Sequence, residues 1–252
     1  MNTVNEIFEF YDKYDKYDKY DKPSIEREEI LNNIKSEDCS DFIKIFSVIN
    51  LLTINNVDEA HGLINNLTNH SNPIREAVSL KLEELFPEFE EYFLDDFSKT
   101  RILAAITDIN PNVSRAICSL ILKSNKMQKF ILEDLILKIK NLIVEMKQYE
   151  KEFKDFFDKS IRNTKNHAKN KKLFALYWSL EALSLCEFQK YNSEVLEILK
   201  YTINFQDYTI REKTAKNLVK LENIPLELLQ KAKSDQNFYV KIQVYDKINF
   251  ED

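Results

Sequence analysis

The sequence predicts an all-α fold, an α-solenoid of stacked antiparallel helix pairs with one long helix near the middle. Three observations predict it. A polar turn followed by an amphipathic helix recurs along the chain, and such a unit cannot bury its apolar face alone, so copies must stack. Glycine, which antiparallel sheets use at tight turns, occurs once in 252 residues. The chain is 44% hydrophobic and 31% charged, as amphipathic helices require.

The recurring unit begins with a turn led by Asn or Asp, and mostly apolar residues then follow at four-residue intervals. The copies are Ile74, Val78 and Leu82; Val113, Ile117 and Ile121; Ile210, Thr214 and Leu218; and Val240, Val244 and Ile248. Residues four apart share one face of a helix, so each copy predicts a helix with an inward stripe. A basic residue accompanies each copy, at Arg75, Arg115, Arg211 and Lys241.

Composition divides the chain into four parts. Residues 1–23 contain an apolar start and four Tyr-Asp-Lys triplets, and residues 24–125 contain the first set of repeats. Residues 126–166 combine a heptad-patterned helix with a basic linker, and residues 167–252 contain the second set of repeats.

Caps and breakers set the expected helices of the first half. Ser24 and Ser40 precede apolar helical patterns and are expected to be N-caps. Pro87 is expected to open a further helix that turns Phe89 and Phe93 inward. The remaining predicted helices of this half span residues 42–52, 57–67, 74–86, 98–109 and 111–122.

The long helix is predicted because apolar residues alternate at intervals of four and three. They are Leu135, Ile139, Leu142, Met146, Tyr149, Phe153 and Phe156. With no Pro or Gly to interrupt residues 126–162, the helix would be about 50 Å long. Two interpretations stay open: self-association through residues 135–156 as a coiled-coil arm, or a long solenoid helix packed along its neighbours.

A basic stretch, residues 162–172, follows the long helix. It is either a phosphate-binding patch or a solvated connection that includes the start of the next helix. The helices predicted after it span residues 173–186, 195–205, 210–221, 226–232 and 240–248.

The turn-Ile/Val-Arg phrase resembles HEAT repeats, in which a turn rich in Asp and Pro leads into the second helix of each unit. Ile74 and Val113 lie 39 positions apart, near the about 40 residues of a HEAT unit, although Ile210 and Val240 lie only 30 apart. The resemblance implies a scaffold that presents a concave surface of second helices to other proteins. It makes Arg75, Arg115, Arg211 and Lys241 candidate binding residues, and it equally implies that the arginine supports packing between units.

Motifs for chemistry are missing or isolated. A single Gly excludes phosphate loops and nucleophile elbows, so the Asp58–His61 sequence, which spells a helicase box, is a coincidence. The three histidines have no metal-ligand spacing, and three distant cysteines form neither a disulfide framework nor a metal site. We therefore expect no catalytic, cofactor-binding or metal-binding residues. Reduced cysteines and the absence of a signal segment or membrane span favour a cytoplasmic protein.

The expected function is that of a non-enzymatic scaffold for a protein or peptide partner. An alternative is a nucleic-acid-binding solenoid, although a net charge of −6 confines that alternative to the basic stretch. A third comes from the resemblance, because alkylpurine DNA glycosylases are built from such repeats and use a basic groove with Trp, Asp and Arg. Against it, Trp178 is the only Trp and it lies in an apolar helix.

Overall fold

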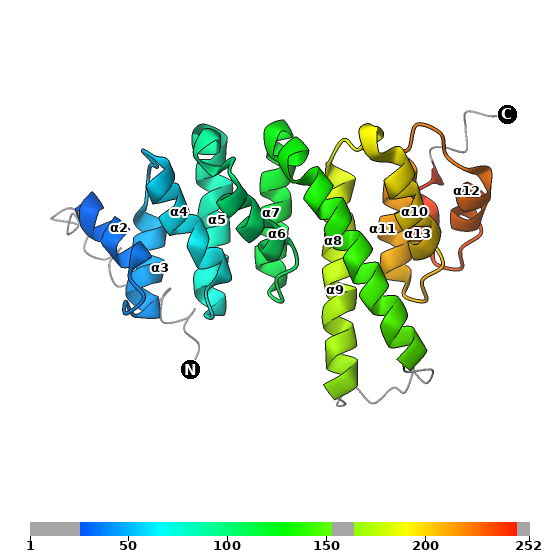
Figure 1. Cartoon of the computed structure of the whole chain (residues 1–252), viewed down its shortest axis with the longest axis horizontal. Coiled ribbons are helices and arrows are strands. Elements are labelled where there is room, and N and C mark those ends of the chain that lie inside the picture. The colour runs from blue at the N-terminus through cyan, green and yellow to red at the C-terminus, as the bar shows by residue number, and fades with distance from the viewer. Residues whose placement is uncertain (1–25, 153–163, 246–252) are drawn as a thin grey trace.

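The computed structural model describes residues 26–152 and 164–245, and all regular structure in these ranges is helical (Figure 1). The α-helices are α2 (Arg27–Lys35), α3 (Asp41–Asn50), α4 (Val57–Asn65), α5 (Asn72–Phe89), α6 (Asp96–Ile106), α7 (Pro111–Lys123), α8 (Asn125–Glu152), α9 (Thr164–Leu185), α10 (Asn192–Thr202), α11 (Tyr208–Leu218), α12 (Leu226–Lys233) and α13 (Phe238–Ile242). Three 3₁₀ turns accompany them: η1 (Asn66–Thr68), η2 (Glu90–Phe93) and η3 (Gln189–Tyr191). None of the helices in these ranges has the length and hydropathy of a membrane-spanning segment.

The helices form successive pairs, α2/α3 through α12/α13, arranged along one axis (Figure 1). The second helices α3, α5, α7, α9, α11 and α13 pack side by side in chain order. The first helices α2, α4, α6, α8 and α10 pack in a parallel row. Each pair therefore buries its apolar face against the next, which confirms the predicted α-solenoid.

The core is one continuous cluster of buried apolar residues that extends from Ile30 in α2 to Val244 after α13. The residues of the recurring unit lie inside it. Ile74, Val78 and Leu82 are each at most 1% exposed, and Val113, Ile117 and Ile121 are fully buried. Thr214 is also buried, where its hydroxyl donates to the Ile210 carbonyl. Ile248 lies outside the described residues.

The polar turns cap the second helices. Asn110, Asp207 and Asn237 each accept a hydrogen bond from the backbone N–H two residues later, at 2.9 to 3.0 Å. The Ser40 side chain accepts from the Ile43 N–H, which confirms it as an N-cap. Each cap satisfies an N–H group that would otherwise have no partner, which is why Asn, Asp and Ser recur at these turns. The Ser24 prediction is wrong, because α2 begins at Arg27 and Glu26 holds its N-cap position without a side-chain capping bond.

The prediction for Pro87 is wrong. Pro87 does not open a helix but lies inside α5, which continues to Phe89 and passes into the 3₁₀ turn η2. A proline removes one intrahelical hydrogen bond and crowds the carbonyl four residues earlier, and α5 ends two residues after it. Phe93 is nevertheless fully buried, stacked on Phe86 with ring centroids 5.6 Å apart.

The long helix α8 is described for 28 residues, or about 42 Å, and α9 runs alongside it. Both extend past the ends of the neighbouring helices (Figure 1). Leu135, Ile139 and Met146 of the heptad pattern are buried within the chain, as expected for a helix packed along its neighbours. Phe153 and Phe156 lie outside the described residues, so self-association through that part stays a prediction.

Polar contacts of α8 hold it against α6. Lys99 on α6 forms an ion pair with Asp134 at 2.9 Å, and its ammonium lies 4.8 Å from the centre of the Phe130 ring. Lys138 donates to the carbonyl of Leu103 in the last turn of α6, and burial lowers the pKa of Lys138 to about 8. Since α8 also packs against α7 and α10, the described residues of α8 continue the stack from the third pair to the fifth.

Candidate functional site

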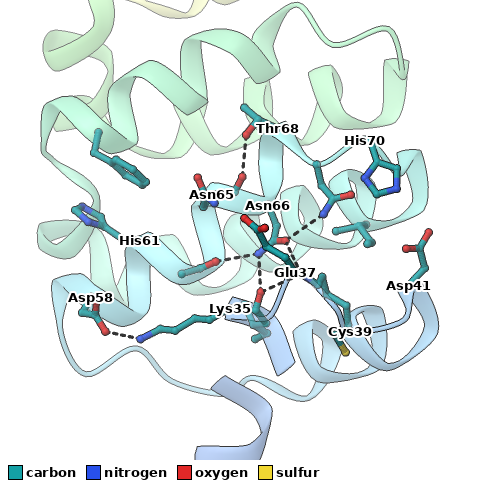
Figure 2. Close-up of a pocket in the computed structure, with 16 residues that line it drawn as sticks. Lys35, Glu37, Cys39, Asp41, Asp58, His61, Asn65, Asn66, Thr68 and His70 are labelled. Atoms are coloured by element: carbon teal, nitrogen blue, oxygen red, sulfur yellow. Dashed lines mark hydrogen bonds and ion pairs between the residues drawn. The ribbon is translucent and has the colours of Figure 1, made fainter. Parts of the chain in front are cut away.

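A polar cleft of about 620 Å³ opens near the first end of the solenoid. It lies between the turn that joins α2 to α3, one face of α4, and the turn that leads into α5 (Figure 2). Figure 2 shows Asp58 and His61 toward one end of the cleft and Asp41 and His70 toward the other. A volume of this size fits a small molecule or a few residues of a peptide.

A buried lysine fixes one wall of the cleft. Lys44 of α3 is 4% exposed, and its ammonium donates to the carbonyls of Ile34 and Ser36 and to Asn66 Oδ1. Asn66 Nδ2 in turn donates to the carbonyls of Ile34 and Gly62, at 3.0 and 2.9 Å. These bonds tie the end of α2 to η1. No carboxylate of the described residues forms an ion pair with Lys44, so neutral oxygens alone compensate its desolvation.

His61 closes the opposite end. Its Nε2 lies 2.8 Å from Asp95 Oδ2, and its ring lies against Phe97 at a tilt of 31° with centroids 4.3 Å apart. Burial by itself would raise the pKa of Asp95, but hydrogen bonds from Ser98 and His61 outweigh it and lower that pKa. The sequence did not indicate this pair because 34 positions separate the two residues. The contact links α4 to the start of α6.

The charged groups of the cleft that bond to no other described residue are mainly carboxylates. Lys35 is paired with Asp58, whereas the exposed side chains of Glu37 and Asp41 make no hydrogen bond or ion pair with other described residues. Cys39 and His70 also line the cleft, and neither side chain bonds to another lining residue. No group of three or more potential metal ligands occurs in the described ranges. The cleft can therefore offer charge and hydrogen bonds to a polar ligand.

Arg75 and Arg211, two of the candidate binding residues, make identical contacts between pairs. Each donates Nε at 2.6 Å and Nη2 at 3.0 Å to an aspartate in the next turn, Asp108 for Arg75 and Asp235 for Arg211. Each also donates Nη1 to two carbonyls of its own preceding turn. The hydrogen bond from Arg211 lowers the pKa of Asp235 despite partial burial. This is the packing role that the HEAT resemblance implies.

Arg115 and Lys241 lie elsewhere and are exposed. Arg115 donates to Asn112 Oδ1 on its own helix at 2.9 Å, and Ser114 occupies the position equivalent to Arg75. The four basic residues lie on four different helices and do not form one site. Partner binding by any of them stays a prediction. The basic stretch is also partly neutralised, because Lys172 is paired with Glu145.

Sequence reasoning missed the polar contacts between second helices. Glu76, Glu83 and Glu90 follow one another at seven-residue spacing from α5 into η2, and each bonds to a residue of α7 or of the start of α8. Glu76 accepts from Asn112, Glu83 from Ser119, and Glu90 pairs with Lys126, at 2.9, 2.6 and 3.1 Å. The constant separation of 36 positions within these pairs is a signal that the sequence does contain.

A second missed cluster joins α9 to α11. Glu181 on α9 lies 2.7 Å from Lys216 and 3.1 Å from Lys213, and the longer contact is an ion pair without hydrogen-bond alignment. Lys213 also lies 4.9 Å from the centre of the Tyr177 ring. Burial by itself would raise the pKa of Glu181, but the two ammonium groups outweigh it and lower that pKa.

Comparisons with known proteins support no finer assignment. No protein-family model and no curated protein matches the chain. Among solved structures, a designed armadillo repeat protein is similar at 10% identity and a TM-score of 0.47, with 87% of this chain and 97% of that chain covered. Likeness at this level carries no argument about function, so the helical-repeat fold is established by the helix packing, and HEAT membership stays an expectation.

We predict that only Cys39 reacts with iodoacetamide at pH 8 in the folded protein. Burial raises the pKa of Cys118 and of Cys186 to about 12, and the thiolate is the reactive form. Cys39 is half-buried at the cleft. Mass spectrometry of labelled peptides checks this, with urea-unfolded protein as the control in which all three react. Equal labelling of the three thiols in the native protein would contradict it.

Proposed function

We propose that this protein is a non-enzymatic scaffold that binds a segment of a protein or peptide in the cleft between α2, α4 and the start of α5. The observation that carries the proposal is an open polar cleft whose carboxylates, Glu37 and Asp41, have no partner among the described residues. Both carboxylates are exposed to solvent, so a ligand with basic groups would meet complementary charge in the cleft.

The walls of the cleft support this role because they are preorganised. Lys44 and Asn66 fix one wall, and the contact between His61 and Asp95 fixes the other. Both are anchored in helices of the continuous stack rather than in long loops. A preformed site loses less conformational entropy on binding, so it binds a flexible peptide more tightly than a loose surface does.

Site-specific photo-crosslinking tests the proposal. A benzophenone amino acid replaces Thr68, an exposed residue at the cleft, or Lys129, an exposed residue of α8 as the control. After irradiation in the native cell, we expect a polypeptide adduct of defined mass at position 68 and none at position 129. The same adducts at both positions, or none at position 68, would count against the cleft as a binding site.

A charge-reversal pair then tests the role of the carboxylates. The changes Glu37→Lys and Asp41→Lys together should abolish the adduct at position 68, because like charges would face the donors of the ligand. The matched control, Glu28→Lys with Glu29→Lys, reverses two acids in the first turn of α2 and should retain it. Retention in both variants would contradict recognition by Glu37 and Asp41.

A further inference from the structure

Helix α3, the second helix of the first described pair, carries an exposed apolar face. It packs against α2 and α5 at one end of the row (Figure 1). Ile43 and Ile49 are 45% and 36% exposed on the face that these two helices do not contact. An exposed apolar face of this kind marks a surface that another segment or a partner covers.

We propose that the N-terminal segment of the same chain, residues 4–11, covers this face. Val4, Ile7, Phe8 and Tyr11 recur at intervals of three, one and three, which is the stripe of an amphipathic helix. Asn5, Glu6 and Glu9 would occupy its polar side. The segment therefore has an apolar stripe of its own to bury, and α3 offers one beside the point where the described chain begins.

The length of chain allows this placement. The described residues begin at Glu26, directly before α2, which packs on α3. Residues 12–25 can span up to about 46 Å when extended, whereas α3 is about 15 Å long. A tethered segment has a high effective concentration at its site, so a modest apolar contact is enough to hold it.

A second copy of the chain fits this face less well. Glu37, Asp38 and Asp41 are exposed at the start of α3, so a symmetric contact between two α3 helices would bring six carboxylates together. The segment of residues 4–11 contributes only Glu6 and Glu9, both outside its apolar stripe.

Hydrogen exchange on the full-length chain tests the inference. The variant combining Ile7→Asp with Phe8→Asp removes the apolar stripe, and we expect the amides of α3 to exchange about tenfold faster or more, with α9 unchanged. The control combining Asn2→Asp with Asn5→Asp adds the same charge on the polar side and should leave exchange in α3 as in the unmodified chain.

Two results would overturn the inference. One is that exchange in α3 is the same in the Ile7→Asp, Phe8→Asp variant as in the unmodified chain. The other is a dimer mass by light scattering together with protection of α3 that rises with protein concentration, because a second copy would then be the cover. Neither result bears on the cleft, whose test uses different residues.

Discussion

Replacing Glu181 with Gln is expected to lower the free energy of unfolding by about 3 kcal/mol. Glu181 is the carboxylate between Lys213 and Lys216, and the side chains of Lys213 and Glu181 are 11% and 18% exposed. Burial by itself would lower the pKa of Lys213, and the charge of Glu181 outweighs it and raises that pKa. Without the carboxylate, the buried ammonium of Lys213 keeps only one carboxylate contact among the described residues, the longer one of 3.3 Å with Glu212. The lost charge compensation is the source of the effect.

Urea denaturation of the two proteins measures the difference, with Glu197→Gln as the matched control. Glu197 is exposed, and its one ion pair within the described part of the chain is with Lys200 on its own helix, so its replacement should cost less than about 0.5 kcal/mol. Because the pKa of Glu181 is lowered on folding, its stabilisation is present above about pH 4.5 and is lost as the pH falls toward the lowered value. Equal costs for the two substitutions, or a difference that persists at pH 2 to 3, would refute the assignment.

Replacing Arg75 with Met is expected to cost about 3 kcal/mol, because Asp108 and two turn carbonyls lose their donor. Both charged side chains are about nine-tenths buried, so water does not readily replace the guanidinium. The matched control is Arg115→Met. It removes the same side chain one pair further along, where the guanidinium is exposed and bonds, among the described residues, only to Asn112. This change should alter stability by less than about 0.5 kcal/mol.

A double-mutant cycle with Asp108→Asn separates the pair from its surroundings. If the two residues act together, the double variant should be about 1 to 3 kcal/mol more stable than the sum of the single effects implies. Additive costs would mean that Arg75 stabilises its own turn and not the contact between pairs. The equivalent cycle at Arg211 and Asp235 should give a similar coupling energy, because the distances are the same.

Local patterns predicted the fold well. The caps at Asn110, Asp207 and Asn237 bond to backbone groups two residues away, so the information lies within one turn. The apolar triplets likewise describe one face of one helix. Pro87 misled because whether a proline opens or closes a helix depends on how the preceding turns pack, which its neighbours in sequence do not specify.

Contacts between helix pairs were harder to predict, but two of them coincide with a repeated turn sequence. Asp108 and Asp235 each stand two residues before the capping Asn, so the repeated Asp-x-Asn turn identifies the partners of Arg75 and Arg211. At the equivalent position before Asp207 the residue is Phe205, and α9 offers no Arg to it. No sequence pattern indicates the cleft. It forms because the turn before α3 contacts η1, and no local pattern of residues specifies that contact.

The polar links of the middle junction have a mechanical consequence. Lys99 and Lys138 tie α6 to α8, yet no hydrogen bond or ion pair between described residues joins α7 to α9. The third and fourth pairs are thus fastened by polar links along one edge only. When tension is applied to the two ends of the described stack, this junction should open on the α7/α9 edge before the α6/α8 edge.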